Sequence, residues 1–107
     1  MSKTIKTIWI ESEENGPVTG GQISIDNNTD VIITFTDERK YVATFFTYQN
    51  IRTLAEENKR TGECLSGKYF WASDMILIEN IDRDTIEKVI DELIKGEEFQ
   101  RVFKYIG

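Results

Sequence analysis

Hydrophobic and polar positions alternate through the first half of the chain, and this pattern predicts β-strands. Four runs rich in β-branched and aromatic residues repeat with a period of two. They cover residues 4–11, 22–26, 31–36 and 41–46. The later runs are joined by short polar segments with turn-forming residues, 27–30 and 37–40. Short connections favour antiparallel hairpins, so we expect an antiparallel sheet.

The hydrophobic period changes to that of a helix at residue 47. Thr47 is placed to cap a helix that runs to about Arg60, and Thr61-Gly62 ends it. A second helix begins at Asp82 or Asp84 and ends at Lys95-Gly96. Its apolar residues are spaced as in a helix packed on a sheet: Ile86, Val89, Ile90, Leu93 and Ile94. A short final helix is expected over 97–105.

Between the helices, residues 63–68 are expected to form a loop and residues 69–79 a strand region, which Ser73-Asp74 can break. The stretch Met75–Ile78 is apolar throughout, which predicts burial on both faces. The element order is therefore ββββαβαα. Residues 1–107 are expected to form one α+β domain, with a mostly antiparallel sheet of about five strands and two to three helices packed on it.

The fourth predicted strand is apolar on both faces. Tyr41, Ala43 and Phe45 share one face, and Val42, Thr44 and Phe46 share the other. Either the helices divide between the two faces, or a partner or second subunit covers one of them. The second possibility gives an alternative function for the chain: a small homodimeric structural or regulatory binding protein without catalytic activity.

The charge is acidic and dispersed along the chain. With 13 Lys and Arg against 19 Asp and Glu, the net charge is −6. Such a chain repels phosphate backbones, which argues against nucleic acid as a partner. Acidity can serve solubility alone, or it can attract a basic protein. No acidic block is present, so only the fold can assemble a negative patch. Cys64 has no second cysteine to pair with, and no apolar run is long enough to cross a bilayer, so we expect a cytoplasmic protein without membrane contact.

The residue types needed for common catalysis are missing, so we expect no enzyme, no metal site and no cofactor. The chain has no histidine, the usual general base and a common zinc ligand. Cys64 is either a reactive thiol or, more simply, a small apolar side chain under a loop. Gly62–Lys68 imitates a phosphate-binding loop, but Tyr69 follows where Ser or Thr is required, and the flanking elements are in the wrong order.

The segment 68–74 is the hardest to explain as scaffold. On a strand, Tyr69 and Trp71 would point one way and Phe70 the other. Exposed Trp and Tyr dominate protein interfaces, and Glu63 and Asp74 would supply an acidic rim. We therefore expect Glu63, Tyr69, Trp71 and Asp74 to contact a protein partner. In the alternative, the final helix covers the second face through Phe99 and Phe103.

The tracts Ala43-Thr44-Phe45-Phe46-Thr47-Tyr48 and Gly62-Glu63-Cys64-Leu65-Ser66-Gly67-Lys68-Tyr69-Phe70 give the chain a family likeness. With its size, acidity and element order, the chain resembles the small acidic immunity proteins of bacterial toxin systems, including contact-dependent growth inhibition. This resemblance implies a cytoplasmic inhibitor that binds and neutralises a cognate toxin, often a basic nuclease, by covering its active site. The acidic surface would then stand in for nucleic-acid phosphates.

Overall fold

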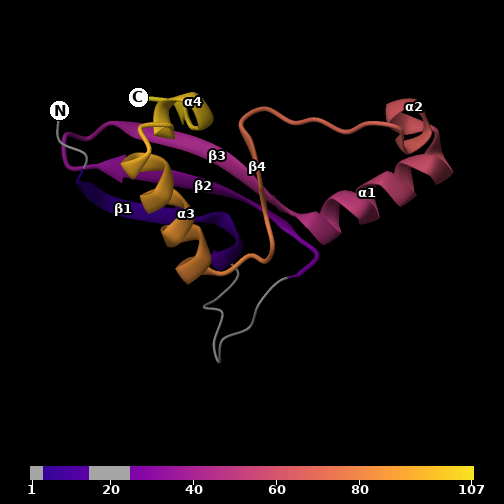
Figure 1. Cartoon of the computed structure of the whole chain (residues 1–107), viewed down its shortest axis with the longest axis horizontal. Helices are drawn as coiled ribbons and strands as arrows, with labels where there is room; N and C mark the ends of the chain where they lie inside the picture. The colour runs from indigo at the N-terminus through magenta and orange to yellow at the C-terminus, as the bar shows by residue number, and fades with distance from the viewer. Residues whose placement is uncertain (1–3, 15–24) are drawn as a thin grey trace.

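The computed structural model describes residues 4–14 and 25–107 and confirms the α+β class (Figure 1). Its strands are β1 (Ile5–Ile10), β2 (Asn28–Phe35), β3 (Lys40–Thr47), β4 (Met75–Ile78) and β5 (Lys104–Tyr105). Its helices are the 3₁₀ turn η1 (Glu11–Glu13), α1 (Tyr48–Thr61), α2 (Glu63–Gly67), α3 (Arg83–Lys95) and α4 (Phe99–Val102).

The strands form one sheet in the order β1-β2-β3-β4, with β5 also paired to β3. The β1–β2, β2–β3 and β3–β5 pairs are antiparallel, whereas β3 and β4 run parallel. The parallel pair arises because the chain leaves β3 through α1 and α2 before it returns to the sheet. The outer edge of β3 is therefore shared: β5 lies beside Tyr41 and Val42, and β4 lies beside residues 44–47.

Two strand predictions change in the structure. Of the expected strand at 22–26, residues 22–24 lie outside the described residues, and Ile25 and Asp26 form a bend. The Asp26 carboxylate accepts hydrogen bonds from Asn50 Nδ2 (3.0 Å) and Thr53 Oγ1 (2.7 Å), which hold this bend against α1. These two bonds, in that order, keep the pKa of Asp26 below its ordinary value. The fifth strand of the described sheet is β5 instead.

The prediction of a final helix over 97–105 was too long. Only Phe99–Val102 is helical, and Phe103 takes an extended conformation. The next two residues pair with β3, because that edge is still open beside Tyr41 and Val42. The prediction for 69–79 was also too long: only β4 is a strand. Leu77 in β4 is 43% exposed, so β4 is not buried on both faces. Leu77 lies beside Phe46, on the sheet face opposite α3 and α4.

The main core lies on one face of the sheet, under α3 and α4. The odd-numbered residues of β2 and β3 face these helices and are buried. Ile86 and Ile90 of α3 are fully buried in the same cluster. Phe99 contacts Phe35 and Tyr41 edge-on, and Phe103 packs on Phe45. Both packing helices therefore cover the same face, and Figure 1 shows them in front of the sheet.

The opposite face of the sheet has no helix over it in the described residues. Trp9, Ile32 and Val42 lie in one row across β1, β2 and β3, and Trp9 is 38% exposed. Phe46 on this face is buried because Phe70 packs on it, with ring centroids 5.4 Å apart. Phe99 and Phe103 lie on the core face, so they do not cover this one.

The helix ends agree with the predicted signals. Thr47 caps α1 by accepting a hydrogen bond from Asn50 N at 3.0 Å, and Asp82 caps α3 by accepting one from Thr85 N at 2.9 Å. Gly62 follows α1 in the left-handed conformation, with φ of 86°. Among the described helices, none has both the length and the apolar character that a bilayer crossing requires.

The first of the predicted helices, α1, does not lie over either face of the sheet (Figure 1). Figure 1 shows α1 extending beyond the end of β3, with α2 at its far end. The core face is already filled by α3 and α4, so α1 packs on α2 instead. We call residues 48–71 the arm and the rest of the described chain the body. The arm explains a radius of gyration of 15.0 Å, against about 13 Å for a compact chain of this length.

Candidate protein-binding site

The tip of the arm is a single left-handed turn. Cys64, Leu65 and Ser66 of α2 have φ of 50°, 52° and 57°, a conformation that costs about 1–2 kcal/mol per residue outside glycine. Gly67 continues the turn with φ of 81°. A Cβ atom on Gly67 would lie 2.3 Å from the carbonyl oxygen of Ala55, so only glycine allows this approach to α1. The close contact sets the path of the segment that follows.

The returning segment exposes two of its three consecutive aromatic side chains. Tyr69 is 51% exposed and Trp71 70%, whereas Phe70 turns inward onto Phe46 of β3. Residues 69–72 are not a strand, yet the alternation expected of a strand is present. Phe70 therefore anchors the segment to the sheet, and its two neighbours are presented to solvent.

Glu63 precedes the returning segment in the sequence, and Asp74 follows it. Glu63 opens α2 at the far tip of the arm, whereas Asp74 directly precedes β4 at the sheet (Figure 1). The Asp74 carbonyl accepts a hydrogen bond from Thr44 N at 2.9 Å and so starts the pairing of β4 with β3. Asp74 has φ of 53°, which turns the chain into that strand. The two residues therefore lie apart, one at the tip of the arm and the other at the sheet.

Two exposed hydrophobic residues of the arm are not among the residues predicted to contact a protein partner. Leu65 is 70% exposed because the left-handed turn holds it outward. Its signal in the sequence was a single leucine in an otherwise polar loop. Tyr48 is 54% exposed, although it forms an apolar stripe along α1 with Ile51, Leu54 and Ala55, which are spaced three and four residues apart. The stripe has no sheet beneath it at this point, and sequence spacing carries no information about that.

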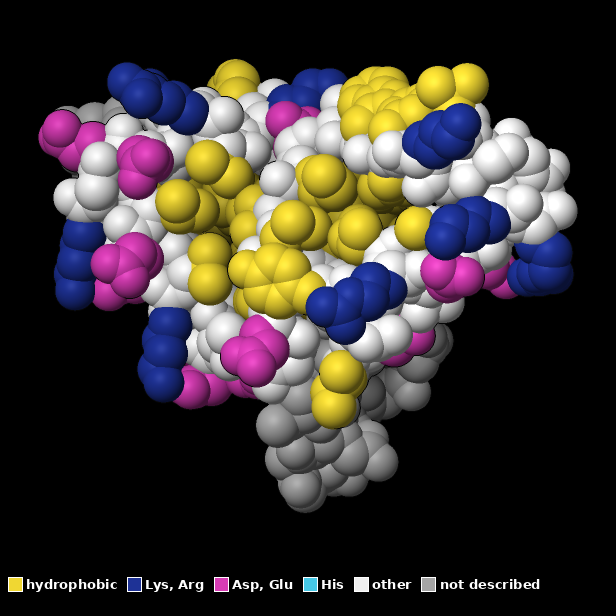
Figure 2. Space-filling model, turned by 45° about the vertical axis from the view of Figure 1, so that its right-hand side comes forward, with side chains coloured by type: hydrophobic (Ala, Val, Ile, Leu, Met, Phe, Trp, Pro, Cys, Tyr) yellow, Lys and Arg dark blue, Asp and Glu magenta, His cyan; other side chains and the backbone are white. Residues whose placement is uncertain are grey.

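Figure 2 shows the hydrophobic side chains as a connected area across the middle of one face. Single Lys, Arg, Asp and Glu side chains surround this area. Large, connected apolar areas on a surface mark sites of interaction.

The fold also gathers acidic residues that are separate in the sequence. Residues 79–98 contain eight acidic and three basic residues, and Glu11, Glu13 and Glu14 lie in and after η1. Arg83 joins the two stretches: its guanidinium donates to both carboxylate oxygens of Glu13, at 2.8 and 3.1 Å. It also donates to Glu87 at 3.1 Å and to the carbonyl of Ile8 at 2.9 Å. These bonds, Glu13 first, raise the pKa of Arg83. We call η1 and residues 79–98 the acidic side.

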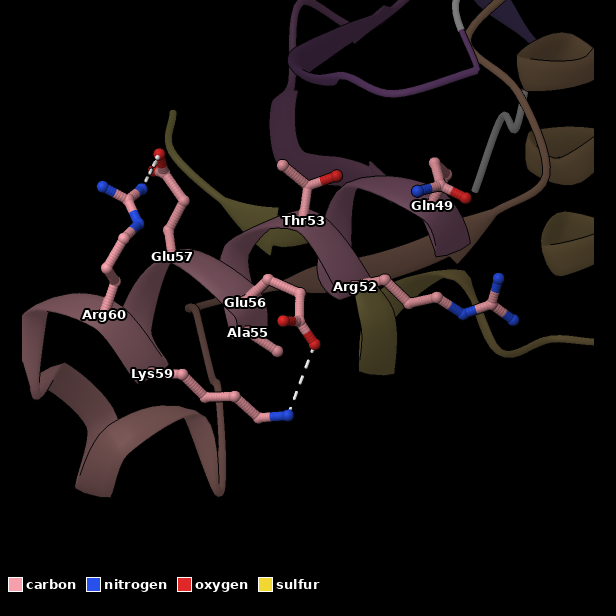
Figure 3. Close-up of a pocket in the computed structure, with 8 residues that line it drawn as sticks. All are labelled: Gln49, Arg52, Thr53, Ala55, Glu56, Glu57, Lys59 and Arg60. Carbon is pink, nitrogen blue, oxygen red and sulfur yellow. Dashed lines mark hydrogen bonds and ion pairs between the residues drawn. The ribbon is translucent and has the colours of Figure 1, made fainter.

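A shallow hollow follows the outer surface of α1, but it does not form an enclosed site. Its lining residues all come from this one helix, so it has no opposite wall (Figure 3). They are Gln49, Arg52, Thr53, Ala55, Glu56, Glu57, Lys59 and Arg60. Lys59 pairs with Glu56 at 3.3 Å and Arg60 pairs with Glu57 at 3.1 Å. Exposed pairs of this kind belong to a solvated helix surface.

The described residues contain no cluster of three Cys, Asp or Glu side chains placed to hold a metal ion. Gly62–Lys68 follows a helix and precedes an extended segment, so it lacks the strand-to-helix setting of a phosphate-binding loop. Cys64 is half-buried within the left-handed turn. The geometry offers surfaces for a protein partner: the exposed aromatic residues of the arm and the acidic side of the body.

Comparison with known proteins adds no relative: no family model matches the chain, and neither the curated proteins nor the solved structures gave a significant match. The function is therefore argued from these surfaces.

Proposed function

We propose that this protein is a cytoplasmic immunity-type inhibitor that binds a basic nuclease toxin, covers its active site, and catalyses no reaction. The observation that supports this most is the acidic side. Two acidic stretches separated by most of the sequence meet through Arg83, and together they carry a net charge of −7, against −6 for the whole chain.

The acidic side has the chemistry that a basic active site binds. Carboxylates at several positions of one surface present separated negative charges, as the phosphates of a nucleic acid do. The same charges speed the encounter with a basic protein at low salt. The resemblance to immunity proteins supports the same partner, a cognate toxin.

The test is a pull-down with the product of the adjacent upstream gene, together with co-expression in cells that this product kills. We expect retention at low salt, release as salt is raised, and protection of the cells. If the neighbouring product is not toxic and is not retained at low salt, the proposal fails.

Two double variants with the same change in net charge test which surface of the protein contacts the toxin. Glu79 and Glu92 are exposed on the acidic side and form no ion pair with another described residue. Changing both to Gln should slow association at least about threefold at low salt. The control, Glu56→Gln with Glu57→Gln on the arm, changes the net charge equally and should leave the rate unchanged. Equal effects of the two pairs would show that the acidic side is not the contact surface.

A further inference from the structure

No element of the described residues covers the exposed side of the arm, although the arm carries side chains that usually require a cover. Four of its large hydrophobic side chains are at least half exposed: Tyr48, Leu65, Tyr69 and Trp71. At these exposures the three aromatic residues present roughly 400 Å² of surface. A stable protein interface buries about 800 Å² on each partner, so these residues supply about half of one.

The charge of the arm differs from that of the rest of the chain. Residues 48–71 contain four basic and three acidic residues, whereas the remainder contains nine basic and sixteen acidic residues. Two of the basic residues on the arm, Lys59 and Arg60, are paired within it. The other two, Arg52 and Lys68, are exposed and form no ion pair with any residue in the described part of the chain.

We propose that the arm docks on the body of a second copy of this chain. The arm carries a net charge of +1, with exposed aromatic residues and with two cations and one carboxylate, at Glu63, that are unpaired within the described part of the chain, whereas the remainder of the chain carries −7. The arm therefore fits an acidic surface better than a basic one. A reciprocal exchange, in which each arm lies on the body of the other copy, closes a two-fold dimer and leaves no arm uncovered. The pinned turn at Gly67 holds Leu65 and the returning segment ready for this contact, which lowers the entropy lost on binding.

This inference does not depend on the proposed function, and its test needs only the purified full chain. Sedimentation should show a monomer–dimer equilibrium between low and high micromolar protein, with association that weakens as salt is raised. Trp71→Ser and Leu65→Ser should each raise the dissociation constant at least about 30-fold if these side chains are central to the interface. Both positions are exposed, so circular dichroism should confirm that the variants keep their fold.

Two charge-reversal variants on the arm and one control variant on the sheet test which surface forms the dimer contact. Arg52→Glu and Lys68→Glu should weaken the dimer, and the effect should shrink at high salt. Val42→Thr lies on the uncovered sheet face and keeps a β-branched side chain, so it should leave the dimer unchanged. A dimer that Val42→Thr breaks and Trp71→Ser does not break would place the contact on the sheet, against the proposal.

Two further results would overturn the inference. The first is a chain that stays monomeric at high micromolar concentration and low salt. The second is a monomer that binds vesicles containing phosphatidylserine through Trp71, because the arm would then serve a membrane surface. Vesicles of phosphatidylcholine alone are the control for that measurement.

Discussion

Gly67 determines the course of the chain at the tip of the arm. Its backbone lies against the carbonyl of Ala55, where no side chain fits. Three preceding residues hold the left-handed conformation, which is unfavourable for each of them. A hydrogen bond from Lys68 N to the Cys64 carbonyl, at 3.1 Å, helps to offset this cost. Strain of this kind persists where surrounding contacts enforce it, and it tends to occur at functional segments.

Replacing Gly67 with Ala should therefore be more harmful than replacing Gly62. Both have positive φ, but a Cβ on Gly62 meets nothing within 4 Å. We expect Gly62→Ala to cost about 1 kcal/mol from backbone strain and Gly67→Ala about 3 kcal/mol, because a clash with backbone is added. Urea unfolding gives the loss of stability, and hydrogen exchange in α1 shows whether the arm is released. Equal losses would mean that the Ala55 contact is not tight.

At the scale of elements, the caps and the turn between β2 and β3 followed the sequence rules, because these act over three or four residues. Residues 28–30, predicted as part of a turn, instead belong to β2. Thr47 caps α1 as predicted, and of the two candidates for α3, Asp82 and Asp84, Asp82 forms the cap. The two caps differ in their surroundings. The Thr47 hydroxyl is fully buried and also accepts a hydrogen bond from Asn27 N at 3.2 Å. It thus joins α1 to the entry of β2. Asp82 caps only α3, through the backbone and hydroxyl of Thr85.

Thr47→Ala should destabilise the protein by about 2 kcal/mol, and Asp82→Ala by about 1 kcal/mol. The difference arises because Thr47→Ala removes the acceptor of two backbone amides, those of Asn27 and Asn50, and the amide of Asn50 is buried. Thermal unfolding followed by circular dichroism measures both. Thr47→Ser and Asp82→Asn retain the accepting oxygen and should lose less than half as much. A larger loss for Asp82→Ala than for Thr47→Ala would contradict this account.

At the scale of the whole molecule, the chain is divided into a body with a large core and an arm with a small one. The body core joins the sheet to α3 and α4, and Ile86 is fully buried in it. In α1, Ile51, Leu54 and Ala55 are only half-buried, because α2 packs on one side of this helix. Parts of a protein with few buried contacts open at lower free energy than its core.

Ile86→Ala and Leu54→Ala should therefore have different consequences. We expect Ile86→Ala to destabilise the whole body by about 2–5 kcal/mol, as for a fully buried side chain. Leu54→Ala should cost about 1 kcal/mol in global unfolding and should mainly speed hydrogen exchange in α1 and α2. Native-state exchange measured by mass spectrometry separates the two regions. If Leu54→Ala speeds exchange in α3 and β2 as much as in α1, the arm is not a separate unit.

The α+β class, the β2–β3 hairpin, the ends of α1 and α3, and the opposite orientation of Phe70 to Tyr69 and Trp71 could be predicted from the sequence alone. Each depends on period or capping over a few neighbouring positions. Tertiary structure decided where α1 lies, that Lys104–Tyr105 form a strand, and that Arg83 joins two acidic stretches. These depend on competition for space and for open strand edges between residues distant in sequence. Local patterns carry no record of that competition, so the arm and the acidic side appear only in the folded chain.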